Sequence, residues 1–237
     1  MSKYFRGSYS IIIFLGIMAF SIILPPASYA QEAIHLEVPH LSQHFTSPDA
    51  NGDTGYYDCA IAASAMALQA ISLERSDLIP TDVSYTSVRR NVRSVHTDIG
   101  KGINLLDASY LIANLTNDSV RGAFVDIGEL SWKSEVGRQL RAGFPIIAHI
   151  EDWRYLPGHG GKNSAAHAIV ITGIDSASVS YIDPWNGREY LVPHDAFEAA
   201  WSVGYHRWYG IVFYENRKAL NFTELTRYRI VASRYRS

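Results

Sequence analysis

The chain has 237 residues, a formal net charge of −2, and lysines and arginines scattered along its length. It therefore lacks the basic stripe by which proteins bind nucleic acid, and no nucleic-acid partner is expected. A hydrophobic content of 47% and an aromatic content of 12% indicate an ordered globular protein rather than a disordered one. A chain of this length can bury a sizeable core within one domain.

Residues 1–30 have the pattern of a secretory signal peptide. A basic segment precedes an apolar stretch from Ile11 to Leu24, and small residues end the segment at Ala30. The apolar stretch is shorter than the ~20 residues that a helix needs to cross a bilayer, which disfavours an uncleaved membrane anchor. We expect cleavage after Ala30, a secreted or periplasmic location, and a single mature domain over residues 31–237 with no membrane anchor.

The mature chain divides into a helix-rich part and a strand-rich part. Helical periodicity predicts four helices, at about 59–73, 82–95, 103–116 and 131–142. Short β-rich runs separated by turn signals predict strands at 33–37, 146–150, 167–174, 179–182, 189–192 and 209–214. This order predicts an α+β fold, with N-terminal helices packed on a C-terminal antiparallel sheet.

Cys59 is the only cysteine of the chain. Cysteines of exported proteins usually pair in disulfides, so a single thiol without an internal partner indicates a reactive residue. It stands where a polar loop turns into a predicted alanine-rich helix, and the positive end of a helix dipole stabilises a thiolate. From position alone, a buried packing residue is an equally good interpretation, because free cysteines are often buried.

Three more polar residues favour the reactive interpretation. His167 begins one predicted strand, Asp183 ends the next, and the turn signal at 175–178 predicts a hairpin between them. A hairpin brings these two strand ends together, so His167 and Asp183 are expected to be neighbours. Such a pair suits a base oriented by a carboxylate, with Cys59 as the nucleophile. The amide of Gln43, upstream in a loop, can donate to an oxyanion.

Six segments surround these residues in a recognisable order. They are Val38–Gln43, Asp58–Met66, Val136–Ile147, Ala166–Gly173, Tyr181–Gly187 and Phe197–Trp201. With these segments the chain resembles the papain-like cysteine peptidases related to the bacteriocin-processing (double-glycine leader) peptidases, in their stand-alone secreted form. The resemblance covers about residues 36–213 and leaves 214–237 as a C-terminal extension.

The resemblance implies a papain-like cysteine peptidase fold and assigns a role to each candidate residue. By the position of each motif, Cys59 is the nucleophile and His167 the general base. Asp183 orients the histidine, and Gln43 contributes to the oxyanion hole. The resemblance implies a peptide or protein substrate, and it requires no cofactor.

The loop between Gln43 and Cys59 is longer than the family pattern and predicts an added surface loop. Its stretch Asp49–Asp53 has the spacing of the first ligands of a calcium loop, but Thr54 and Ala60 replace the glycine and glutamate that such a loop requires. The nine histidines show no zinc-ligand spacing such as His-Glu-x-x-His. We therefore expect neither a metal nor a cofactor in the reaction.

The functional hypothesis that these residues favour is an exported thiol hydrolase acting on peptide or isopeptide bonds through an acyl-enzyme. A cell-wall amide hydrolase or a transglutaminase-like acyl transferase is an alternative, because both use the same kind of nucleophile. A catalytically inactive peptide-binding domain on the same fold is a third possibility. The intact set of Cys59, His167, Asp183 and Gln43 argues against it.

Overall fold

The computed structural model describes residues 33–44, 55, 57–79, 83–94, 102–129, 131–158, 166–216 and 229–230. The predicted signal peptide, the Asp49–Asp53 loop and most of the C-terminal extension lie outside the described residues. All the described residues belong to one unit of the chain, Gln31–Ser237. Among them, no helix is long and apolar enough to cross a membrane.

The four predicted helices form, and a fifth follows in the second half of the chain. The α-helices of the described residues are α1 (Cys59–Glu74), α2 (Tyr85–Asn91), α3 (Leu105–Leu115), α4 (Trp132–Arg141) and α5 (His194–Trp201). The side chain of Ser84 caps α2 and that of Asn104 caps α3, each by accepting a backbone N–H. Ser131 occupies the cap position of α4, but its side chain makes no capping hydrogen bond and instead donates its hydroxyl to the carbonyl of Ile127 at 2.5 Å.

Helix α1 is buried on nearly every side. The sequence predicts that Ile61, Ala65, Leu68 and Ile71 face inward, whereas every residue from Ala60 to Leu68 is buried. The reason is that α1 packs against strands β3 and β4 and also against helices α2 and α3. Its many alanines permit this close approach from several directions, and a helix that is apolar all round is typical of a buried position.

The strands form one antiparallel sheet in the order β6-β5-β4-β3-β7-β2-β8. Strand β1 pairs with Gly173 and Ile174 of β4, just beyond the residues of β4 that pair with β3. It therefore lies on the same side of β4 as β3 does. The strands are β1 (Ile34–His35), β2 (Val120–Asp126), β3 (Ile146–Ile150), β4 (His167–Ile174), β5 (Ser178–Asp183), β6 (Arg188–Pro193), β7 (Tyr209–Glu215) and β8 (Arg229–Ile230).

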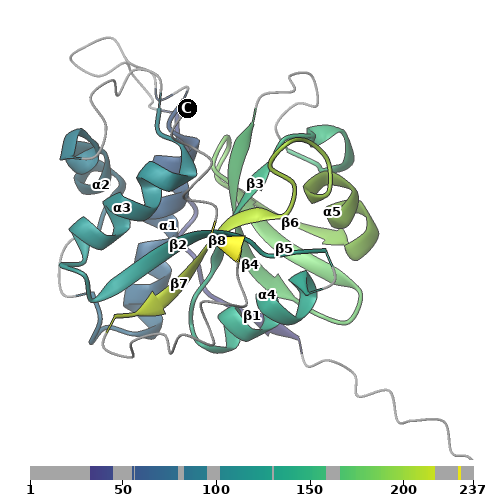
Figure 1. Ribbon diagram of the computed structural model, residues 1–237, viewed down its shortest axis with the longest axis horizontal. Helices are drawn as coiled ribbons and strands as arrows, with labels where there is room; N and C mark the ends of the chain where they lie inside the picture. Colours follow the sequence, from purple (N-terminus) through teal and green to yellow (C-terminus); the bar gives the residue numbers. More distant parts are fainter. Residues whose placement is uncertain are drawn as a thin grey trace, which may run out of the picture. The chain divides into compact units, whose positions relative to one another are not determined.

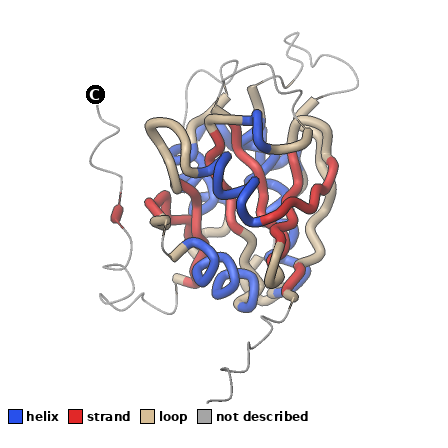
Figure 2. Tube along the Cα trace, turned by 90° about the vertical axis from the view of Figure 1, so that its right-hand side faces the viewer, coloured by secondary structure: helices blue, strands red, loops and turns tan. Residues whose placement is uncertain are grey.

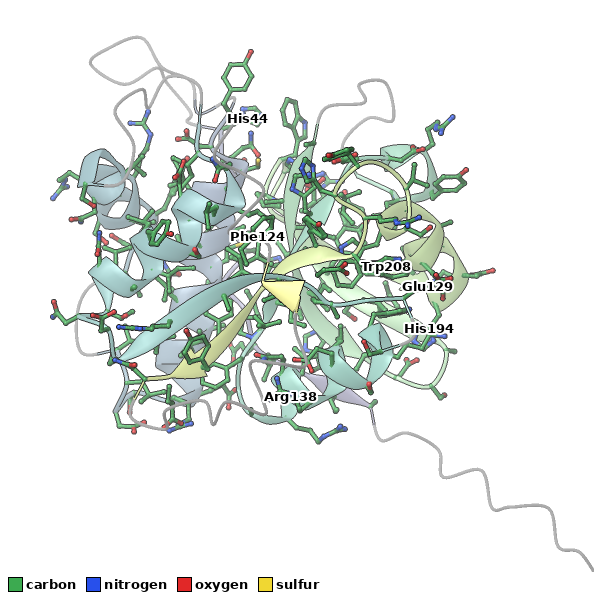
Figure 3. All side chains as sticks on the ribbon, viewed as in Figure 1. His44, Phe124, Glu129, Arg138, His194 and Trp208 are labelled. Carbon is green, nitrogen blue, oxygen red and sulfur yellow. The ribbon has the colours of Figure 1, made fainter. Side chains whose placement is uncertain are left out.

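The helices cover different parts of the sheet (Figure 1). Helix α3 packs on β2 and β7, α1 on β4 and β3, and α4 and α5 on the strands from β3 to β6. Figure 2 shows the same strands, in red, with the helices around them. Trp132 of α4 joins α4 to α5 through an aromatic cluster with Phe197, Trp201 and Trp208, and Figure 3 labels Trp208 on the α5 side of the molecule.

Three of these helices and strands, β2, β8 and α5, were not predicted from the sequence. Strand β2 contains Gly122, which weakens a strand signal, but a Cβ at this position would lie only 2.7 Å from the side chain of Ile211. Helix α5 is short and begins directly after β6 at Pro193. Because β2 lies between α3 and α4, the helices and strands are less separated along the chain than expected, yet the fold class remains α+β.

Candidate active site

The β4–β5 hairpin brings His167 and Asp183 together as expected. The turn pairs Ile174 with Val179, and a bulge between Ile171 and Gly173 shifts the register before β5 reaches Asp183. His167 Nε2 lies 2.7 Å from Asp183 Oδ1, and both side chains are buried. The predicted proximity of these two residues is therefore confirmed by a direct hydrogen bond.

Asp183 is held in one orientation by the turn that follows it. Its Oδ1 accepts the backbone N–H of Trp185 at 2.8 Å in addition to His167. Its Oδ2 is buried without a hydrogen-bond partner among the described residues and lies against Gly158, where a Cβ would stand 2.7 Å from this oxygen. Gly158 has a φ of +120°, so both the backbone and the carboxylate require glycine there.

Cys59 is the first residue of α1 and lies beside the start of β4. The residue as a whole is half-buried, and its thiol hydrogen-bonds to the side chain of His167. The backbone N–H groups of Ala168 and Ala60 also bond to the sulfur. Because His167 Nε2 is bonded to Asp183, the other ring nitrogen, Nδ1, is the atom left to face the thiol.

The electrostatics of this group favour an ion pair between Cys59 and His167. Burial raises the pKa of the Cys59 thiol, but the charge and hydrogen bond of His167 outweigh it and hold the pKa below its ordinary value. Burial alone would lower the pKa of His167. The Cys59 thiolate and Asp183 raise it by more than burial lowers it, so the pKa of His167 is raised to about 9. Both shifts favour a thiolate beside an imidazolium over a neutral thiol beside a neutral imidazole.

The residue before the nucleophile candidate anchors the start of α1. Asp58 is buried and pairs with Arg89 Nε at 2.7 Å, and it also lies 2.9 Å from the hydroxyl of Tyr85. Arg89 balances a carboxylate that would otherwise disfavour a thiolate at Cys59. Sequence reasoning missed both partners, although Tyr85 and Arg89 are four residues apart on α2 and so share one helix face.

Gln43 lies between the segment that precedes Cys59 and the turn that follows Asp183. Its Nε2 donates to the carbonyl of Gly55 at 3.2 Å, and its backbone N–H donates to the carbonyl of Pro184 at 2.6 Å. Its own carbonyl lies 3.0 Å from the Tyr85 hydroxyl. The side chain is buried. All four candidate residues thus belong to connected segments, although the role of each remains a prediction.

The adjacent turn places two aromatic rings beside Gln43. The ring of His44 packs edge-on against that of Trp185, with 4.2 Å between the ring centroids. Figure 3 labels His44 at the edge of the molecule. The hydroxyl of Ser42 donates to the carbonyl of Trp185 at 3.2 Å, which binds the two segments together.

The comparisons with known proteins agree with this fold. The model of the Peptidase_C39 like family matches residues 35–206, and the chain belongs to this family. A crystal structure of a C39-like peptidase from Bacillus anthracis is similar at a TM-score of 0.53 and 17% sequence identity, and the match covers 78% of this chain and 98% of that chain. No curated protein matches the chain.

These findings confirm both the family resemblance and the fold class, which is α+β and papain-like. The family match runs over nearly the same residues as the resemblance found in the sequence. Family membership indicates a function of the cysteine peptidase type. The identity to the solved structure is low, so that comparison supports the fold alone.

The Cys59–His167 pair predicts a thiol that is already reactive at pH values well below those at which an ordinary cysteine thiol ionises. Replacement of His167 by alanine removes the charge that lowers the Cys59 pKa, while the desolvation that raises it remains. We expect alkylation by iodoacetamide at about pH 6.5 to slow by roughly 10- to 100-fold, because an ordinary thiol is only about 1% ionised there. The measurement is the alkylation rate as a function of pH.

The matched control is His35→Ala, which removes a histidine paired with the carboxylate of Glu189 at 2.7 Å on an exposed edge. This variant should keep the wild-type profile. If His167→Ala were alkylated at about pH 6.5 as fast as the wild type, His167 would not be the cause of the lowered thiol pKa.

Proposed function

We propose that this protein is an exported cysteine peptidase that hydrolyses peptide or isopeptide bonds through a thioester acyl-enzyme. The observation that carries the proposal is the buried hydrogen bond from His167 to Asp183, with His167 also bonded to the Cys59 thiol. Membership of the Peptidase_C39 like family supports the same chemistry. The proposal of export rests on the sequence pattern of residues 1–30.

In the proposed reaction the Cys59 thiolate attacks the carbonyl carbon of the scissile bond and forms a tetrahedral intermediate. The protonated His167 gives its proton to the leaving amine as the carbon–nitrogen bond breaks, which leaves a thioester on Cys59. The now neutral His167 takes a proton from water, whose oxygen attacks the thioester and releases the acid. Asp183 fixes the orientation of the imidazole and stabilises its charged form in both steps.

We assign Gln43 to the stabilisation of the oxyanion in both tetrahedral intermediates. The assignment rests on the buried position of Gln43, which donates hydrogen bonds to the carbonyls of Gly55 and Pro184. Gly55 lies in the segment that precedes Cys59, and Pro184 directly follows Asp183. The first backbone N–H groups of a helix have no acceptor within it, so those at the start of α1 are further candidate donors to the oxyanion. A fixed donor costs no reorganisation when the charge develops.

The substrate is proposed to be a peptide or protein. A cell-wall amide hydrolase would use the same thioester and differ only in the acyl donor, and a transglutaminase-like enzyme would pass the acyl group to an amine instead of water. Products therefore distinguish these alternatives. Tests with a peptide library, with peptidoglycan and with an added amine acceptor cover the three possibilities.

Cys59→Ala should abolish turnover on any substrate that the wild type cleaves, by at least about 10³-fold in kcat/KM, because no other residue can form the thioester. Circular dichroism should show an unchanged fold, since the side chain is small and the residue is half-buried. Retained turnover in this variant would contradict the mechanism. Absence of turnover by the wild type, together with an ordinary thiol reactivity, would favour the inactive binding domain.

Gln43→Ala should lower kcat by roughly 10²-fold and change KM much less, because an oxyanion donor acts mainly in the transition state. The matched control is Gln69→Ala, since Gln69 also donates its amide to a backbone carbonyl at 3.2 Å, that of Val83, but lies further along α1. The measurement is steady-state kinetics on one peptide. Equal kcat values for the two variants would remove Gln43 from the oxyanion hole.

A further inference from the structure

Three side chains outside the proposed catalytic group converge from two distant parts of the chain. His149 lies on β3, Glu151 follows β3 directly, and His206 lies between α5 and β7. Glu151 Oε1 is 2.6 Å from His206 Nδ1 and 3.5 Å from His149 Nε2. One ligand atom from each of the three residues lies within 4.8 Å of the others.

The separations of Glu151 from the two histidines, 2.6 and 3.5 Å, lie on either side of the separation between neighbouring ligands in a tetrahedral metal site. Zinc binds imidazole nitrogen and carboxylate oxygen at about 2.0–2.2 Å, which places neighbouring ligand atoms about 3.3 Å apart. The two rings are inclined at 61° with centroids 5.2 Å apart, so neither ring covers the other. Small rotations of the side chains would bring the three ligand atoms to coordination distance.

Glu151 is held in place by the backbone of the segment that carries His206. Its Oε2 accepts the N–H of Tyr205 at 2.7 Å, and its Oε1 accepts the N–H of His206 at 3.1 Å. Gly204, with a φ of +97°, lies so close that any Cβ would collide with the Glu151 carboxylate. The carboxylate is thus oriented by its surroundings, as carboxylates that bind metals are.

The ion pair between Glu151 and His206 does not explain why a third polar side chain, that of His149, is placed beside them. Its Nε2 is buried and has no hydrogen-bond partner among the described residues, although the carboxylate of Glu151 lies 3.5 Å away. A buried polar atom without a partner is costly, and a bound ion is one way to satisfy it.

We propose that His149, Glu151 and His206 form a binding site for a divalent transition-metal ion of the zinc type. Two imidazoles and one carboxylate are the ligands that zinc accepts, whereas calcium and magnesium require more oxygen ligands. The three side chains are partly open to solvent, so water completes the coordination. None of the three residues is Cys59, His167 or Asp183, and the proposal does not depend on the proposed peptidase activity.

A metal at this position would join β3 to the segment before β7. His149 pairs across the sheet with Ala168, whose backbone N–H bonds to Cys59, so the joined segments lie next to the strand that carries His167. The ion would therefore stabilise the part of the sheet from which the candidate base projects. The expected role is structural, because no ligand is a member of the catalytic group.

The test is metal binding by the purified, untagged protein in a Cys59→Ser background, in which no thiol can bind the ion. Titration with Zn²⁺ by calorimetry, and with Co²⁺ by its visible absorption, should show one site per chain. His149→Gln should weaken binding by at least about 100-fold, because loss of a ligand costs more than loss of an outer hydrogen bond, which itself costs 10- to 100-fold.

The matched control is His35→Gln, which removes a histidine from a two-member pair with Glu189 and should leave the affinity within about twofold. Zn²⁺ should also raise the melting temperature of the Cys59→Ser protein, and not that of its His149→Gln variant. His149→Gln is the deciding change, since Glu151 also holds the backbone of the 204–206 segment. Absence of binding, or binding that survives His149→Gln, would overturn the proposal.

Discussion

The buried contact between His167 and Asp183 is the interaction on which the rest of the site depends. A charged imidazole away from water is stable only beside an opposite charge, and removing one member of a buried pair costs about 3–5 kcal/mol. Here the imidazolium stands between two negative groups, the carboxylate of Asp183 and the thiolate of Cys59. The three charges stabilise one another, and the pKa values of Cys59 and His167 shift in opposite directions as a result.

The fold supplies this contact by combining a rigid helix with a hairpin. Helix α1 is buried nearly all round, so Cys59 at its first turn has a fixed position relative to β4. The hairpin brings Asp183 back to the same end of the sheet as His167. The ion pair between the buried Asp58 and the half-buried Arg89 then joins the start of α1 to α2. Tyr85 links that pair to the segment of Gln43.

Local signals in the sequence were sufficient for α1 and for the β4–β5 hairpin. The alanine-rich run after Cys59 predicts the helix, and the turn signal at 175–178 predicts the hairpin that makes His167 and Asp183 neighbours. Strand β2 was missed because Gly122 interrupts the strand pattern in the sequence. Position 122 is a glycine because the side chain of Ile211 on β7 leaves no room for a Cβ.

Contacts between distant segments are the features that the sequence could not predict. The roles of Tyr85 and Arg89 follow from the packing of α2 on the start of α1. The group of His149, Glu151 and His206 has no recognisable motif spacing, because His206 lies 55 residues after Glu151 and reaches it only through the folding of the chain. Groups of this kind can be recognised only from the folded structure, in which the strands bring the distant residues together.

The pKa of His167 tests the proposed ion pair with Cys59 most directly. An NMR titration of the imidazole resonances, with His167 assigned by comparison with His167→Gln, should show a pKa of about 9, well above the ordinary value of about 6.5. In Cys59→Ala the value should fall, because one of the two negative neighbours is gone. A His167 that titrates at its ordinary value in the wild type, or that is unaffected by Cys59→Ala, would contradict the ion pair.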